Sequence, residues 1–158
     1  MARSYWPAYM PLVTEPLYTR DILRLAASIP HLGRLASPDA SLEKRAPVCG
    51  SSIIVDLVLD GAGRVAAIGQ EVKACAFGQA SAALMGQHVL GRTPAELAEA
   101  RDALAAWLAG TSDDPGAWPG LDILSPARRL SARHGAILLP FQAAAEAAAL
   151  AAHEAVRP

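Results

Sequence analysis

Apolar and polar residues alternate most regularly in the middle of the chain, where they predict a β-hairpin. Two alternating runs, at positions 52–60 and 64–73, flank a Gly-Ala-Gly turn centred on Ala62. A period of two is typical of strands that bury one face. The predicted buried face carries Ile53, Val55, Leu57 and Leu59 in the first run and Ala66, Ile68 and Val72 in the second; Asp56, Asp60, Glu71 and Lys73 lie opposite. Aligning the two apolar faces requires paired positions whose numbers have an odd sum.

Apolar spacings of three and four residues predict helices on both sides of the hairpin. The expected helices span 17–28, 77–90, 93–110 and 139–156. The third begins with Thr93-Pro94-Ala95-Glu96, a capping box with proline at the first helical position. The positions expected to face inward are Ala80, Leu84 and His88 in the second helix, Leu97, Leu104 and Leu108 in the third, and Phe141 and Leu150 in the last.

The remaining segments complete the expected architecture. Residues 41–46 fit a brief edge strand, 111–119 a surface loop containing two prolines, and 121–133 has no decisive pattern. Residues 1–16 are rich in proline and aromatic side chains and are expected to form an extended lead-in to a single domain at 17–158. Two or three strands beside four or five helices predict an α+β domain, with a small antiparallel sheet packed against helices.

Composition and charge exclude several classes of protein. The 158 residues are 53% hydrophobic and 18% charged, with a formal net charge of −1, which fits a globular domain and not a disordered chain. No basic run or basic-aromatic stripe is present, so we expect no nucleic-acid partner. We expect no membrane partner either, because no apolar stretch is expected to reach the roughly 20 residues of a span. The N-terminus lacks the apolar core of a signal peptide, so the expected location is the cytoplasm.

Cys49 and Cys75 are the two cysteines of the chain, and each lies thirteen residues from Ala62. Residues equidistant from a hairpin turn lie close together, so we expect the two thiols to be neighbours. Their numbers have an even sum, which predicts an offset of about one residue or an intervening bulge. Cys75 is expected where strand gives way to helix, where amide N–H groups and the helix dipole favour a thiolate.

Two chemical interpretations of this pair are open. Soft thiolates suit zinc, copper(I) and iron–sulfur clusters, although two cysteines supply half of the four ligands of a closed site. Alternatively, both thiols are small buried apolar groups.

The sequences around both cysteines resemble a known family. Pro47-Val48-Cys49-Gly50 before a strand, and residues 73–85 around Cys75, are similar to the IscU/SufU/NifU N-terminal family of iron–sulfur cluster assembly proteins. Residues 17–23 and the segment 111–126 are most similar to its SufU-like branch, and the resemblance covers about residues 17–150. It implies a SufE/IscU-like fold that binds iron, an iron–sulfur cluster or persulfide transiently, zinc being possible. The implied partners are a cysteine desulfurase and apo iron–sulfur proteins.

The chain departs from the family pattern at two positions. Ser51 stands where the family has an aspartate, and the family's third cysteine would fall near Ala136, which has no ligand atom in its side chain. His134 stands where a histidine often accompanies that third cysteine. The resemblance therefore implies as candidate metal ligands Cys49, Cys75 and His134. The alternative for His134 is an exposed loop histidine among arginines.

Three functions are left open by these residues. The first is an iron–sulfur assembly scaffold or sulfur acceptor, which is a non-enzymatic carrier. The second is a binding or regulatory module that kept the fold and lost the chemistry, as the residues at positions 51 and 136 suggest. The third is zinc-dependent sulfur transfer of the SufU type. The metal and the oligomeric state are not determined by the sequence.

Overall fold

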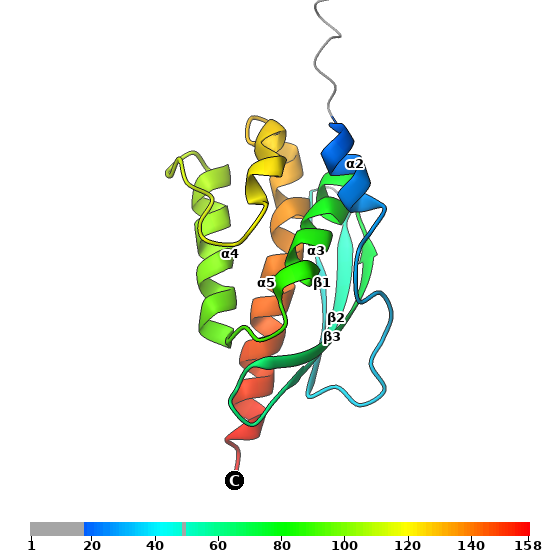
Figure 1. The fold of residues 1–158 in the computed structure, drawn as a ribbon, viewed down its shortest axis with the longest axis vertical. Helices are drawn as coiled ribbons and strands as arrows, with labels where there is room; N and C mark the ends of the chain where they lie inside the picture. Colours follow the sequence, from blue (N-terminus) through cyan, green and yellow to red (C-terminus); the bar gives the residue numbers. More distant parts are fainter. Residues whose placement is uncertain (1–17, 49) are drawn as a thin grey trace, which may run out of the picture.

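A computed structural model describes residues 18–48 and 50–158; the predicted lead-in at 1–16 lies outside this part of the chain. The elements are α2 (Arg20–Ala26), β1 (Ala40–Arg45), β2 (Ser52–Leu59), β3 (Val65–Lys73), α3 (Ala76–His88), α4 (Pro94–Leu108), the 3-10 helix η3 (Leu121–Ala127) and α5 (Ser131–Ala155). The strands form one antiparallel sheet in the order β1-β2-β3 (Figure 1). This confirms the predicted α+β class, and the predicted edge strand is β1.

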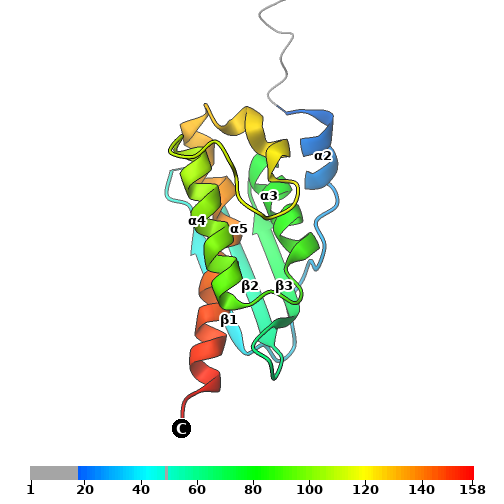
Figure 2. The ribbon, with the colours of Figure 1, turned by 60° about the vertical axis from the view of Figure 1, so that its left-hand side comes forward.

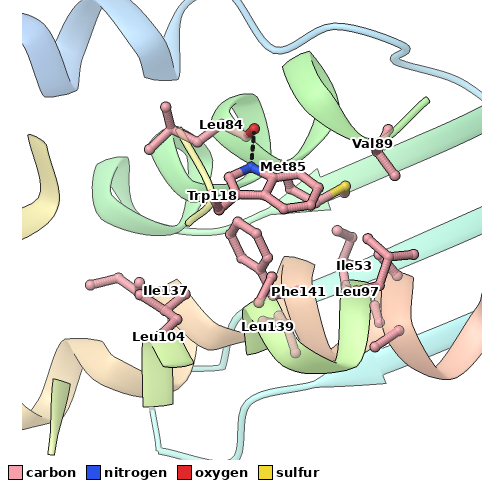
Figure 3. Packing of buried hydrophobic residues seen from close by; sticks show 14 of the residues in the cluster. Ile53, Leu84, Met85, Val89, Leu97, Leu104, Trp118, Ile137, Leu139 and Phe141 are labelled. Atoms are coloured by element: carbon pink, nitrogen blue, oxygen red, sulfur yellow. Dashed lines mark hydrogen bonds between the residues drawn. The ribbon is translucent and has the colours of Figure 1, made fainter. Parts of the chain in front are cut away.

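The helices form two layers on one face of the sheet. α5 contacts β1 and β2, and α3 packs beside α5 and contacts β3. α4 packs against α5 on the side away from the sheet (Figure 1 and Figure 2). Figure 3 shows the core between these layers, where Met85, Leu104 and Phe141 are among the buried side chains.

The register of the hairpin has the predicted parity up to a bulge near the turn. Every pair from Ser52 with Lys73 to Val58 with Ala67 has an odd sum. The register then shifts, so that Leu59 pairs with Val65 and the residue between Val65 and Ala67 has no partner on β2. That residue, Ala66, is exposed, and Val65 is buried in its place. The prediction that Ala66 shares the buried face is therefore wrong, because the bulge reverses the alternation there.

The predicted capping box of α4 is confirmed. The Thr93 hydroxyl oxygen accepts a hydrogen bond from the Glu96 N–H at 3.1 Å, and the Glu96 carboxylate accepts one from the Thr93 N–H at 3.2 Å. The predicted inward positions of α4 are buried, as are those of α3 apart from half-buried His88; these are Leu97, Leu104, Leu108, Ala80 and Leu84.

The segment 111–119 is not only a surface loop, since Trp118 is 5% exposed. Its indole N–H donates a 2.8 Å hydrogen bond to the Leu84 carbonyl oxygen, and its ring lies edge-on to Phe141 at 5.3 Å (Figure 3). The Arg92 guanidinium lies 4.7 Å from the centre of the indole ring. Trp118 thus fixes this segment against α3 and α5.

The last helix is longer than the sequence predicts. α5 begins at Ser131 rather than Leu139 and contains Pro140. Proline is common in the first turn of a helix, but Pro140 lies in the interior of this one. Phe141 is buried as expected, whereas Leu150 is 44% exposed. The two residues are nine positions apart, which at about 100° per residue puts them on opposite sides of the helix. Beyond Phe141, the buried residues of α5 are all alanines.

By length and composition alone, α5 could cross a membrane, so the expectation that no apolar stretch reaches that length is wrong. In the fold, 61% of its most apolar window is buried. Its neighbours are α3, α4 and the sheet. This is the environment of a core helix.

Asp56 is predicted on the face of β2 away from the helices, and a loop buries it there. Arg34 Nε donates to its carboxylate at 2.7 Å, the Ser41 hydroxyl at 2.6 Å and the Leu35 N–H at 2.9 Å. Burial raises the pKa of Asp56, but these hydrogen bonds and the Arg34 charge lower it more, so the pKa lies below the ordinary 3.8. The ionised carboxylate therefore anchors the 31–39 segment across the sheet.

Candidate functional site

Cys75 lies between the end of β3 and the first turn of α3, as predicted. It is the N-cap residue, with extended backbone angles (φ −67°, ψ 172°), and its side chain makes no capping hydrogen bond. The Gln79 N–H donates to the Cys75 carbonyl oxygen, and the Gln79 side-chain amide donates to the Ala74 carbonyl oxygen, both at 2.9 Å. These bonds fix the backbone on both sides of a half-buried thiol.

An aromatic pair supports the first turn of α3. Phe77 is fully buried, and the ring of Tyr18 lies 5.0 Å from it. Tyr18 directly precedes Thr19, whose hydroxyl oxygen accepts a 3.2 Å hydrogen bond from the Ile22 N–H and caps α2. α2 therefore begins beside the turn that carries Cys75.

The connection from β1 to β2 is held by two backbone hydrogen bonds. The Ala46 N–H donates to the Ser51 carbonyl oxygen at 2.8 Å, and the Gly50 N–H donates to the Ala46 carbonyl oxygen at 3.2 Å. Gly50 has a φ of +70°, a conformation that favours glycine. Ser51 is buried. Cys49 lies outside the described residues, so the predicted proximity of the two thiols stays a prediction.

The position implied for a third cysteine packs against the first turn of α3. Ala136 on α5 is fully buried. A Cβ added to Gly78 would lie 3.2 Å from both the Cβ and the carbonyl oxygen of Ala136, and 2.6 Å from the Ala74 Cβ. On the neighbouring residue of α5, a Cβ added to Gly135 would lie 3.5 Å from the Ala46 Cβ. The first turn of α3, the end of β1 and this part of α5 therefore meet, and a methyl group occupies the third position.

His134 is anchored by the end of η3. Its Nε2 lies 3.0 Å from the Ala127 carbonyl oxygen and 2.9 Å from the Arg128 carbonyl oxygen. A ring nitrogen that faces two carbonyl oxygens acts as the donor, so in the neutral imidazole the lone pair lies on Nδ1. His134 and Ala136 are two residues apart and project about 200° apart around α5. A ligand role for His134 stays a prediction, and Nδ1 is the atom that would bind.

The donor groups of the described residues fall short of a closed metal site. Among residues 18–48 and 50–158, no three His, Cys, Asp or Glu side chains are grouped to hold a metal ion. At the junction of α3 and α5, the described residues provide the Cys75 thiol as a ligand, whereas Ala136 provides none. This set of ligands does not fit a closed four-ligand centre, whereas an open carrier site needs fewer ligands.

Two contacts that the sequence analysis missed hold α5 in place. The buried Ser81 hydroxyl donates to the Ile137 carbonyl oxygen, next to the Gly78 contact. Lys44 on β1 forms a 3.0 Å ion pair with Glu146 on α5. A serine within the alanine-rich run of α3 is the one sequence signal for the first contact.

Comparison with solved structures finds close relatives of this fold. The N-terminal nitrogen-fixing NifU-like protein of Brucella abortus superposes with a TM-score of 0.81 and is 36% identical, covering 87% of this chain and 95% of that one. A protein of Fervidobacterium islandicum AW-1, described as a putative iron–sulfur cluster assembly scaffold protein for the SUF system, superposes with a TM-score of 0.74. It is 20% identical, covers 84% of this chain and 96% of that one, and supports the fold alone.

Comparisons with family models and with curated protein sequences give no match. Placement in the SufU-like branch stays a prediction. The NifU-like relative shares more than a third of its residues with this chain over nearly its whole length. The chain belongs to the IscU/SufU/NifU N-terminal family.

Proposed function

We propose that this protein is a cytoplasmic iron–sulfur cluster assembly protein, a scaffold or sulfur acceptor that takes up its cargo at Cys49 and Cys75. The observation that carries the proposal is the 36% identity to the NifU-like protein over 87% of the chain. The position of Cys75 supports it, because a thiol at the N-cap of α3 is where the family pattern has its second cysteine. The Fervidobacterium protein of the same fold is described as a putative scaffold for cluster assembly.

The chemistry of Cys75 suits a sulfur acceptor. Its half-buried side chain lies at the N-cap of α3 and makes no capping hydrogen bond. The thiolate attacks the outer sulfur of a persulfide on a cysteine desulfurase. A sulfur–sulfur bond forms on Cys75, the bond in the donor breaks, and the donor leaves as a thiolate.

An incomplete ligand set fits a carrier. Iron or a nascent cluster is cargo here, and an apo iron–sulfur protein must be able to remove it. Persulfide formation requires one thiolate, whereas a retained cluster requires up to about four ligands. Because Ala136 is buried at the third position, sulfur acceptance is the function that requires the fewest ligand side chains from this protein.

The burial of Ala136 also favours a second candidate function, a binding module that retained the fold without cluster chemistry. In that case, replacing both cysteines leaves cellular iron–sulfur enzyme activities unchanged. Stoichiometric zinc in protein purified without chelator would instead point to SufU-type sulfur transfer.

The test is anaerobic reconstitution with ferrous iron and sulfide, followed by desalting. The wild type is compared with the Cys49→Ser/Cys75→Ser double variant and with His153→Ala, a control at an exposed position near the other end of α5. We expect visible charge-transfer absorption and bound iron in the wild type and the control, and neither in the double variant. A colourless wild type, or a double variant that binds as much iron, would refute the scaffold form of the proposal. Sulfur acceptance, which requires one thiolate, is tested separately by the mass that the protein gains from a cysteine desulfurase.

A further inference from the structure

Within the part of the chain that the structure describes, the 31–39 segment covers one half of the sheet face away from α3 and α5. The 31–39 segment crosses it at Asp56, and a Cβ on Gly69 would lie 2.5 Å from the Gly33 carbonyl oxygen, so loop and sheet are in direct contact there. The other half contains a hollow of about 480 Å³. Its lining residues, which define the sheet hollow, are Glu43, Arg45, Gly50, Ser52, Ile54, Glu71, Val72 and Lys73.

The strand register arranges the charges of the sheet hollow in two rows. In the acidic row, Ile54 on β2 pairs with Glu43 on one side and with Glu71 on the other. In the basic row, Ser52 pairs with Arg45 and with Lys73. The basic row lies nearer to Gly50.

Strand geometry sets the spacing of these rows. Residues two apart in a strand are separated by roughly 6.6 Å, and the outer strands of three by roughly 9.6 Å. Arg45 and Glu43 form a 3.2 Å ion pair, but their side chains are 72% and 51% exposed. Such exposed pairs contribute little to stability, so both charges can exchange partners.

We propose that the sheet hollow docks a segment of the cysteine desulfurase that delivers sulfur. This rests on the proposed function. The segment would place carboxylates over the basic row, an apolar side chain on Ile54, and a cation over the acidic row. Opposite charges two residues apart in an extended segment, or one helical turn of about 5.4 Å apart, match the row spacing.

The location supports this occupant, and the charge pattern sets its orientation. Gly50 lines the hollow and directly follows Cys49 in the chain, so a partner seated there approaches the cargo site. Alternating charge rows select one orientation, because a reversed segment would put like charges together. The same complementarity raises the association rate and makes it dependent on salt.

The test measures binding of the full chain to purified cysteine desulfurase by isothermal titration. The Arg45→Glu/Lys73→Glu variant reverses the basic row. The control Arg101→Glu/Arg157→Glu makes the same change in net charge on α4 and near the C-terminus. We expect the affinity to fall about tenfold in the first variant, or about 1.4 kcal/mol, and less than about twofold in the control.

A second variant guards against a folding defect. Ser52→Glu places a carboxylate between the two cations and leaves both in position, and it is expected to weaken binding in the same direction. Equal affinity of the wild type and the basic-row variants, or no binding by the wild type, would overturn the docking proposal.

The two proposals fail separately. Reconstitution with ferrous iron and inorganic sulfide needs no desulfurase, and the Arg45→Glu/Lys73→Glu variant is expected to reconstitute like the wild type. Failed reconstitution with intact docking would refute the scaffold form of the proposed function alone. Normal reconstitution with failed docking would refute the docking proposal alone.

Discussion

Replacing Gly78 with alanine tests the close contact between α3 and α5 that fills the third ligand position. In a helix, Gly→Ala is ordinarily stabilising by up to about 1 kcal/mol. At Gly78, however, the new Cβ would lie 2.6 Å from the Ala74 Cβ and 3.2 Å from the Ala136 carbonyl oxygen. Carbon atoms prefer separations of about 3.5–4.0 Å, and such overpacking typically costs about 1–3 kcal/mol. We therefore expect Gly78→Ala to be destabilising by about 1 kcal/mol net.

Gly135→Ala is the matched control, because it lies on the facing helix with an open environment. Its new Cβ would lie 3.5 Å from the Ala46 Cβ, an ordinary contact. We expect a gain of about 0.5–1 kcal/mol, so the two variants should differ by about 2 kcal/mol. For a chain of this length that corresponds to a difference in Tm of about 4–8 °C. Thermal and urea unfolding followed by circular dichroism measure it. Equal stabilisation by both substitutions would refute the close approach at Gly78.

Three further outcomes follow from the structure. The pKa of Asp56 is lowered in the fold, so its contribution to the free energy of unfolding is complete above about pH 4 and is lost as the pH falls through the folded pKa. In urea unfolding, the difference in stability between the wild type and Asp56→Asn should therefore narrow below about pH 4. A difference that stays constant with pH would contradict the anchoring role. Trp118→Phe removes the hydrogen bond to the Leu84 carbonyl oxygen and should lower the free energy of unfolding by about 1–2 kcal/mol in the same assay. An unchanged urea midpoint would contradict the role of this hydrogen bond. Ala136→Cys adds a thiol at the first turn of α3 and should increase the iron retained after reconstitution and desalting; a folded variant that retains no more iron than wild type would contradict the placement of this position at the site.

Local rules determine the parts of the fold that the sequence predicts. The hairpin parity follows from alternation with period two, and the start of α4 from a capping box that is complete within four residues. The site is predictable where it depends on the same local rules. Cys75 ends a strand and begins a helix, and both patterns are visible around it.

The parts that were missed depend on tertiary contacts. Asp56 is buried because a distant loop brings Arg34 to it, and Trp118 because its indole N–H reaches a carbonyl group of α3. The early start of α5 depends on packing against α3 and β1, which tolerates Pro140 inside the helix. The same packing encloses Ala136. The spacing of residues along the chain carries no information about how closely α5 approaches α3 at this position.

The central claim is that the two cysteines accept sulfur, and the most direct measurement is the intact mass of the protein after incubation with purified cysteine desulfurase and L-cysteine under non-reducing conditions. We expect the wild type to gain the mass of whole sulfur atoms, removable by a thiol reductant, and the Cys49→Ser/Cys75→Ser variant to gain none. A wild type of unchanged mass, or a double variant loaded to the same extent, would contradict it.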